Sequence, residues 1–352
     1  MSPDEKENFT SDELVRLKQS PEFREMKMRA EAAEAKLRRI YNTPVWKFSK
    51  PLRKIYGRIF QYLTAKSEKK YVFMPDPLEG QPVIDLVRDR ITLESNNANL
   101  NHESIAVIAH FSKSNLISES LTNYLRAILN SKYSVILVSA CESDTELVLD
   151  EKIKSQITIL RKPNLGYDFG SWAVAIDKFP EILLAEKLLL TNDSLIGPLD
   201  DFSSIVKDLE NSKFDIAGIT DNSQLQYHVQ SYVLLFKQSA LRNLNVQNLL
   251  KSVVHLELKN EVILKYELGL TRTAQLSGLF VGAIFPWNLI VQPGKNPSLA
   301  GWKRLMDLGF PFLKREAVRL GSFSEVNEMS KYISFKYPNN SWAVNEIKEV
   351  AK

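Results

Sequence analysis

The feature that most constrains the fold of this chain is an alternation of short apolar runs with helix-periodic segments, from about residue 105 onward. Four runs are too short for buried helices and are predicted to be strands: SIAVIAHF, YSVILVSAC, QITILRK and KLLLTND. Between them, residues 115–130 and 169–180 carry apolar side chains at helical spacing. Strands that alternate with helices predict an α/β fold, in which a mostly parallel sheet is flanked by helices on both faces.

A binding site is predicted at one edge of this sheet. In such folds, ligands lie beyond the carboxyl ends of the strands. Polar residues gather at the predicted ends: His110, Ser139, Glu142, Asn164 to Asp168, and Asn192 to Ser194. This coincidence predicts a site without reference to any known family.

The turn PNLGYDFGSW, residues 163–172, lies between a predicted strand and a predicted helix. Gly166 allows a positive φ or a close approach of the backbone to a ligand. Asp168 can cap the helix, whose first N–H groups would favour a phosphate. The turn has neither Walker A nor GxGxxG spacing, so a simple helix-capping turn is the alternative.

The segment LLLTNDSLIGP brings Asp193 directly after a predicted buried strand. A carboxylate at this place can hold Mg²⁺ or Mn²⁺ against a diphosphate. Asn192 and Ser194 flank it, so the segment offers a single carboxylate. A turn stabilised by the Asp side chain is the alternative interpretation.

Two further segments carry candidate catalytic or binding groups. Asp221, His228 and Gln230 precede the apolar strand SYVLLF. His228 can bind a phosphate, a sugar hydroxyl or a metal, or it can be structural. Glu267 lies in the predicted helix KYELGLTRTAQLSG. A carboxylate is the usual group to deprotonate an acceptor hydroxyl, and a solvated helix glutamate is the alternative.

Composition argues against several other classes of protein. Cys141 is the only cysteine, so no internal disulfide can form, which fits a reducing cytoplasm. No apolar run reaches the length of about 18 residues that spans a membrane, and the polar start MSPDEKENFTSDE is unlike a signal peptide. No CxxC or His/Cys cluster suggests zinc, and no GxSxG motif suggests a serine hydrolase.

The N-terminal region concentrates the positive charge. Residues 11–41 carry a short heptad seam, which predicts either a self-associating coil or a helix packed on its own domain. Residues 41–70 hold eight Lys or Arg and one acid, Glu68. The apolar stripe after Pro51 predicts an amphipathic helix that binds an anionic membrane surface through residues 46–66, with packing on the core as the alternative. Charge confined to one segment argues against nucleic-acid binding.

These patterns predict four regions. They are an N-terminal helical segment over 1–70, a connector over 71–104 with a short helix around 83–91, the α/β domain over 105–335, and a C-terminal tail over 336–352. We expect a cytoplasmic protein attached peripherally to the inner face of the cell membrane.

From about residue 105 to 319, the chain resembles the rhamnan synthesis F family of polysaccharide glycosyltransferases. Segments in matching order carry the resemblance: IAVIAHF, KPNLGYDFGSW, LLTNDSLIGPL, DIAGITDN, YHVQSYVLLF, YELGLT and NPSLAGWKRLMDLGFPFLKREAVR. The segment TPVWKFSKPLR with the helix before it resembles an extension found on many bacterial polysaccharide transferases. The resemblance implies a GT-A-like, Rossmann-like fold and a transferase that uses a nucleotide-sugar, associated with rhamnose-containing O-antigens and cell-wall glycans.

Analogy to large inverting GT-A transferases implies further roles. Asn164 to Gly166 are similar to a nucleotide-binding turn, and Tyr266 and Glu267 stand where the catalytic Glu-Asp pair of those enzymes lies. Asn192 and Asp193 stand where a metal-binding DxD motif would lie, so Asp193 is the expected ligand of Mg²⁺ or Mn²⁺, although the departure from DxD leaves metal dependence open.

The implied reaction is an inverting transfer of a deoxysugar, with dTDP-L-rhamnose as the favoured donor and a lipid-linked oligosaccharide or polysaccharide as acceptor. Glu267 is the expected base and Asp221 the second choice. Lys314 and Arg315 either stabilise the leaving diphosphate or form a surface charge pair. The expected nucleotide-sugar site comprises His110, Asn164, Gly166, Asp168, Asn192, Asp193, His228, Gln230, Lys314 and Arg315.

Two other functions are compatible with the sequence. The chain can be a catalytically inactive glycan-binding or scaffold subunit that holds other polysaccharide-assembly enzymes at the membrane. It can also be a sugar-nucleotide hydrolase or a nucleotidyltransferase, which would break down the donor without an acceptor.

Overall fold

The computed structural model describes residues 80–100 and 103–352. The chain divides into two units, Met1–Met74 and Pro75–Lys352, and every element named below belongs to the second. The predicted heptad helix and the basic segment over residues 46–66 lie outside the described residues.

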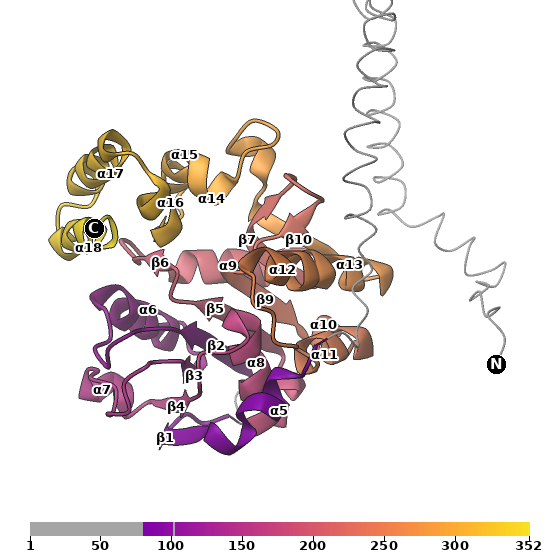
Figure 1. Cartoon of the computed structure of the whole chain (residues 1–352). Coiled ribbons are helices and arrows are strands. Elements are labelled where there is room, and N and C mark those ends of the chain that lie inside the picture. Colours follow the sequence, from indigo (N-terminus) through magenta and orange to yellow (C-terminus); the bar gives the residue numbers. More distant parts are fainter. Residues whose placement is uncertain (1–79, 101–102) are drawn as a thin grey trace, which may run out of the picture. The chain divides into compact units, whose positions relative to one another are not determined.

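One sheet of nine strands forms the centre of the unit (Figure 1). The spatial order of eight strands is β1-β4-β3-β2-β5-β9-β7-β10, and β8 pairs with β7. The strands are β1 (Thr92–Asn96), β2 (Ser104–His110), β3 (Ser134–Ser139), β4 (Ile157–Arg161), β5 (Lys187–Asn192), β7 (Ile216–Asn222), β8 (His228–Val229), β9 (Val233–Lys237) and β10 (Val281–Phe285).

Six of these strands run in one direction. The pairs β2–β3, β3–β4, β2–β5 and β7–β10 are parallel. Strand β9 is antiparallel to both of its neighbours, β5 and β7, so these two run the same way. Strand β1 adds an antiparallel edge beside β4. The predicted fold class, an α/β fold with a mostly parallel sheet, is confirmed.

Both faces of the sheet are buried, which explains why the strands read as continuous apolar runs. Along β2, Ile105 and Val107 point into one hydrophobic cluster, whereas Ala106 and Ile108 point into another. All four side chains are fully buried. Because successive side chains of a strand point to opposite faces, a polar residue within such a strand would lose its hydration on either face.

Helices cover the two faces. The first cluster contains residues of α5 (Val83–Val87), α8 (Tyr167–Lys178), η3 (Pro180–Leu184), α10 (Gln238–Leu241), α11 (Leu244–Lys251), α12 (Lys259–Val262), the π-helix η4 (Ile263–Leu268) and α13 (Gly269–Leu276). The second contains residues of α6 (Glu119–Asn130), α7 (Glu151–Lys154), α9 (Ser203–Asn211) and α15 (Trp302–Asp307). The other short helices are η2 (Arg88–Arg90), η5 (Trp287–Leu289) and α14 (Pro297–Ala300).

A third cluster lies around the C-terminal helices α16 (Arg315–Leu320), α17 (Phe323–Lys336) and α18 (Ser341–Val350). These helices pack on a two-stranded ribbon, in which β6 (Leu195–Ile196) pairs with β11 (Leu313–Lys314). Residues 336–352, expected as a tail, therefore carry a packed helix.

The structure also places ordered elements in the expected connector. Helix α5 packs against α8, and β1 pairs with β4. The polar sequence of β1 fits its place at the sheet edge, where most of its residues are exposed. The predicted helix over 115–130 begins at Glu119, because the Ser118 side chain accepts a hydrogen bond from Leu121 N and caps it. No helix within the described residues is long and apolar enough to cross a membrane.

Candidate active site

The carboxyl ends of β2, β3 and β5 bring His110, Ser139 and Asp193 together. His110 Nδ1 lies 2.9 Å from Ser139 Oγ, and its Nε2 lies 3.9 Å from Asp193 Oδ2. The same carboxylate oxygen accepts a hydrogen bond from Phe111 N at 3.1 Å. Burial lowers the pKa of His110, and the negative charge of Asp193 opposes that effect. The Asp193 carboxylate is thus held over the end of β2.

The turn after β4 depends on a buried lysine that sequence reasoning missed. Lys162 Nζ donates hydrogen bonds of 2.8 Å to the carbonyls of Pro163 and Leu165. Burial lowers the pKa of Lys162 to about 8, although Asp168 opposes the shift. Gly166 takes a φ of 81°, and a Cβ there would lie 2.5 Å from Val83 Cγ2. Both the positive φ and the lack of space for a Cβ therefore require glycine at position 166.

Asp168 faces β5 and does not cap its helix. Helix α8 begins at Tyr167 with Gly166 as its N-cap residue, so Asp168 lies in the first turn. Its Oδ2 accepts a hydrogen bond from Asn192 Nδ2 at 2.7 Å. The contact joins the turn after β4 to the end of β5.

The segment between β7 and β9 forms the opposite wall. Because β9 is antiparallel to β5, the residues just before β9 lie at the same sheet edge as the carboxyl ends of the parallel strands. Ser231 Oγ donates a hydrogen bond to Glu267 Oε1 at 2.5 Å. His228 Nε2 lies 3.6 Å from Glu267 Oε2, and the two side chains are 3% and 18% exposed. Glu267 comes from η4, which contacts β8.

The β6–β11 ribbon supplies cationic residues. It follows Asp193 directly and brings Lys314 opposite Leu195. Arg315 Nε then donates a hydrogen bond to the carbonyl oxygen of Asp193 at 2.9 Å. Lys314 Nζ lies 5.1 Å from the centre of the Tyr232 ring.

These walls enclose a cavity of about 320 Å³. Seven of the predicted site residues line it: Asp168, Asn192, His228, Gln230, Glu267, Lys314 and Arg315. Gln230 accepts a hydrogen bond from Thr220 Oγ1 at 2.7 Å, which fixes its amide at the wall. Arg319 and Asn296, which were not predicted, also line the cavity.

Five predicted residues do not line this cavity: His110, Asn164, Gly166, Asp193 and Asp221. Asp221 Oδ1 accepts a hydrogen bond from Trp287 N at 2.7 Å, so its carboxylate stabilises the loop after β10. Burial raises its pKa, while the hydrogen bonds from Trp287 and Tyr227 lower it. Asn164 lines a second hollow of about 550 Å³ beyond β3 and β4.

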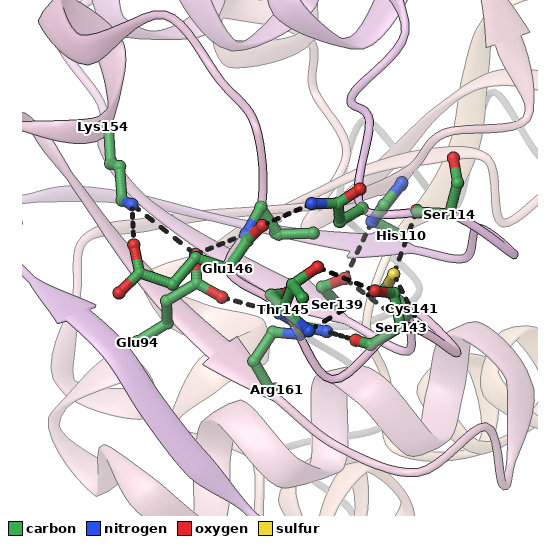
Figure 2. A network of polar contacts seen from close by, with 12 residues as sticks. Glu94, His110, Ser114, Ser139, Cys141, Ser143, Thr145, Glu146, Lys154 and Arg161 are labelled. Carbon is green, nitrogen blue, oxygen red and sulfur yellow. Dashed lines mark hydrogen bonds and ion pairs between the residues drawn. The ribbon is translucent and has the colours of Figure 1, made fainter.

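A buried ion pair shapes this second hollow (Figure 2). Arg161 Nη1 lies 2.7 Å from Glu94 Oε2 and donates to the carbonyl of Thr145 at 3.0 Å. Glu94 Oε1 accepts a hydrogen bond from Leu147 N at 2.9 Å. The pair thus fixes the loop after β3. Arg161 and Lys162 end a predicted strand in QITILRK, so the rule that singled out His110 could also have found them.

Within the described part of the chain, no group of three His, Cys, Asp or Glu side chains has the geometry of a metal site. Asp193 can contribute a single carboxylate, and its side chain is 26% exposed. Mg²⁺ is often held by one or two carboxylates together with substrate phosphates. The residues therefore fit a divalent cation only in company with a bound phosphate group.

The fold and the site define an α/β protein with a polar ligand cavity at the carboxyl edge of its sheet. The chain belongs to the family described as rhamnan synthesis protein F, which matches residues 149–340. It is therefore a glycosyltransferase of polysaccharide synthesis.

Two curated relatives are similar over about half of this chain. The virulence protein VirA of Vibrio anguillarum is 28% identical over 223 residues, which cover 54% of this chain and 71% of VirA. The uncharacterized protein y4gN of Sinorhizobium fredii is 24% identical over 196 residues, which cover 54% of this chain and 50% of y4gN.

Likeness to solved structures is low. A cytidylyltransferase from Leptospira borgpetersenii gives a TM-score of 0.31 at 15% identity, covering 53% of this chain and 76% of its own. The catalytic domain of Drosophila β1,4-galactosyltransferase 7, in complex with xylobiose, gives a TM-score of 0.27 at 9% identity. The match covers 55% of this chain and 68% of that domain. Scores of this size do not establish a shared fold.

Proposed function

We propose that this chain transfers a deoxysugar, with L-rhamnose favoured, from a nucleotide-sugar to a growing lipid-linked polysaccharide, with inversion at the anomeric carbon. The observation that carries the proposal is one cavity in which the carboxylate of Glu267 faces a wall containing Lys314, Arg315 and Arg319. A transfer from a nucleotide diphosphate needs a base for the acceptor and positive charge for the leaving group.

In this proposal, Glu267 removes the proton from the acceptor hydroxyl. The acceptor oxygen attacks the anomeric carbon through an oxocarbenium-like transition state, and the bond to the diphosphate oxygen breaks. The cationic side chains offset the charge that develops on the diphosphate. Should a divalent cation take part, Asp193 would hold it, and it would add to that offset.

The second hollow is proposed to hold the nucleoside end of the donor. It is lined by the loop after β3 and by Asn164, and it lies at the same sheet edge as the cavity. dTDP-L-rhamnose is the favoured donor because the family is named for rhamnan synthesis. Attachment to the inner face of the membrane through residues 46–66, and association with other assembly enzymes, belong to the same proposal.

The test is nucleotide release from a panel of dTDP-, GDP- and UDP-sugars, with and without a rhamnose-terminated acceptor and with and without Mg²⁺ or Mn²⁺. We expect acceptor-dependent release from one donor. Glu267→Gln should lower kcat by about 10² to 10⁴, the usual contribution of a general base. Glu261→Gln, an exposed glutamate on the helix just before η4, is the matched control and should retain activity.

Each alternative has its own outcome in this assay. Release that needs no acceptor would indicate a hydrolase or nucleotidyltransferase. No release from any donor by a folded protein would favour the inactive glycan-binding or scaffold subunit. If removal of Mg²⁺ lowers the activity of the wild type but not that of Asp193→Asn, the cation is assigned to Asp193.

A further inference from the structure

The buried histidine beside Glu267 has a tautomer that its surroundings determine. His228 Nδ1 lies 2.8 Å from the carbonyl oxygen of Gln226. A carbonyl oxygen can only accept, so Nδ1 must carry the hydrogen. Neutral His228 therefore directs the lone pair of Nε2 towards its neighbour. That neighbour is Glu267 Oε2, 3.6 Å away.

The second oxygen of Glu267 already has a donor. Ser231 Oγ donates to Oε1 at 2.5 Å, which leaves Oε2 facing the histidine. A carboxylate and an imidazole lone pair repel each other unless a proton lies between them. Two such groups bind one shared proton more tightly than either would alone, and they titrate as a pair.

We propose that His228 is the proton-accepting partner of Glu267, so that the two side chains act as one base. This inference rests on the proposed transfer reaction. The acceptor O–H bond breaks, and its proton passes to Glu267 and then to His228 Nε2. The acceptor oxygen forms the new bond to the anomeric carbon, and the electron pair of the broken glycosyl bond leaves on the diphosphate.

The distance fits this role before substrate binds. A separation of 3.6 Å is slightly longer than a hydrogen bond, and such contacts often shorten in the substrate complex. Burial raises the pKa of the nearby Asp221 carboxyl, and the charge of His228 acts in the opposite direction. The other titratable or charged groups around the pair are Tyr227, Tyr232, Asp168, Lys314, Arg315, Glu316 and Arg319.

The first arm of the test needs no enzyme activity. The chain has four histidines, so selective ¹⁵N labelling gives a small set of ring signals, and His228→Gln assigns those of His228. We expect the hydrogen of neutral His228 on Nδ1. In Glu267→Gln, the pH of half protonation of His228 should fall, because the imidazolium loses its carboxylate partner. An Nε2-bound hydrogen, or the same midpoint in both proteins, would overturn the pairing.

The second arm is the pH dependence of kcat/KM. His228→Gln keeps an amide near Glu267 but cannot take up a proton. We expect kcat to fall at least 10-fold and the acid limb to move to lower pH, because Glu267 then titrates alone. Glu261→Gln, the exposed glutamate already named, serves as the control, and its acid limb should coincide with that of the wild type.

The outcomes separate the two levels of the proposal. A lower kcat with an unchanged or raised acid limb would reduce His228 to a structural role and refute proton acceptance. A paired titration in the first arm, together with no transfer from any donor, would refute the proposed function and leave the pair established as a binding feature only.

Discussion

Two carboxylates of the site have different neighbours, and the difference suggests different roles. Asp193 accepts from a backbone N–H and lies beside His110, whose pKa burial lowers. Glu267 accepts from Ser231 and faces His228. Both carboxylates lie near an imidazole, but only Glu267 lines the cavity. Glu267 is therefore the proposed base, and Asp193 the proposed ligand of a cation.

The buried Lys162 predicts a pH dependence of stability. Its folded pKa is about 8, below the ordinary value of 10.5, so the unfolded chain binds more protons between these values. Stability should therefore rise with pH in this window. We expect the free energy of unfolding of the wild type, relative to that of Lys162→Met, to increase by about 1 kcal/mol per pH unit above pH 8. Urea titrations at a series of pH values measure the difference, and a constant difference from pH 7 to pH 9.5 would contradict the prediction.

Gly166 predicts a steric effect that a control can separate from backbone strain. Gly166→Ala combines a positive φ with a Cβ 2.5 Å from Val83 Cγ2. Gly294→Ala combines a similar φ of 79° with open space. We expect the first to lower the free energy of unfolding by about 1–3 kcal/mol more than the second, the usual range for overpacking. Addition of Val83→Ala should recover part of that loss; equal losses in the two single variants would refute the steric explanation.

At the scale of elements, two strand pairings assemble the cavity from distant parts of the chain. Strand β9 runs antiparallel and returns residues 228–231 to the carboxyl edge of the sheet. The β6–β11 ribbon joins Arg315 to Asp193, 122 positions apart in sequence. Both pairings also bury apolar side chains, such as Leu234 of β9 and Ile196 of β6, and each brings one wall of the cavity into place.

Helix α18 predicts a link between the C-terminal region and the site. Glu346 is 7% exposed, and its Oε2 accepts from Ser120 Oγ at 2.6 Å while its Oε1 pairs with Arg315. We expect Glu346→Ala to lower the free energy of unfolding by about 2 kcal/mol, typical of hydrogen bonds to charged groups. The KM for donor should rise, because Arg315 loses a restraint.

Chemical denaturation and donor titration measure these two effects of Glu346→Ala. Glu349→Ala, an exposed glutamate on the same helix, is the control and should stay within about 0.5 kcal/mol of the wild type. Equal behaviour of the two variants would exclude the link.

At the scale of the whole molecule, the described unit is larger than the region that matches the family. The match begins at residue 149, yet β2 and β3 precede it and lie next to each other in the middle of the sheet. Strand β2 pairs with β5 and also supplies His110. A fragment that begins at the match would expose the edge of β5 and lose the contacts of His110 and Phe111 with Asp193, so the folding unit includes residues 80–100 and 103–148.

The N-terminal segment carries a prediction from sequence alone, because it lies outside the described residues. We expect deletion of residues 41–70 to abolish co-sedimentation with anionic liposomes, since each basic residue near such a surface contributes about 1 kcal/mol. Replacement of Lys50, Arg53, Lys54 and Arg58 by Gln keeps the apolar stripe and tests the charge by itself. Neutral liposomes give the baseline, and unchanged sedimentation after the deletion would rule out membrane binding through this segment.

The sequence by itself determined the elements and the edge of the sheet where the site lies. Apolar runs such as that of β2 are buried on both faces, and this burial imposes a pattern that can be read locally. His110, Asp168 and Asn192 were found because they end strands or begin a helix. Strand β1 could not be found, because an exposed edge strand needs no apolar pattern.

Only the tertiary structure decided which side chains meet. The direction of β9 is not encoded in its apolar run, yet it decides that His228 and Ser231 lie near Glu267 and not at the opposite edge. The sequence favours Glu267 as the base over Asp221, but only the structure shows that Glu267 lines the cavity while the Asp221 carboxylate accepts from Trp287 N outside it. Local periodicity follows from the backbone of each element, whereas contacts between distant residues depend on how whole elements pack against each other.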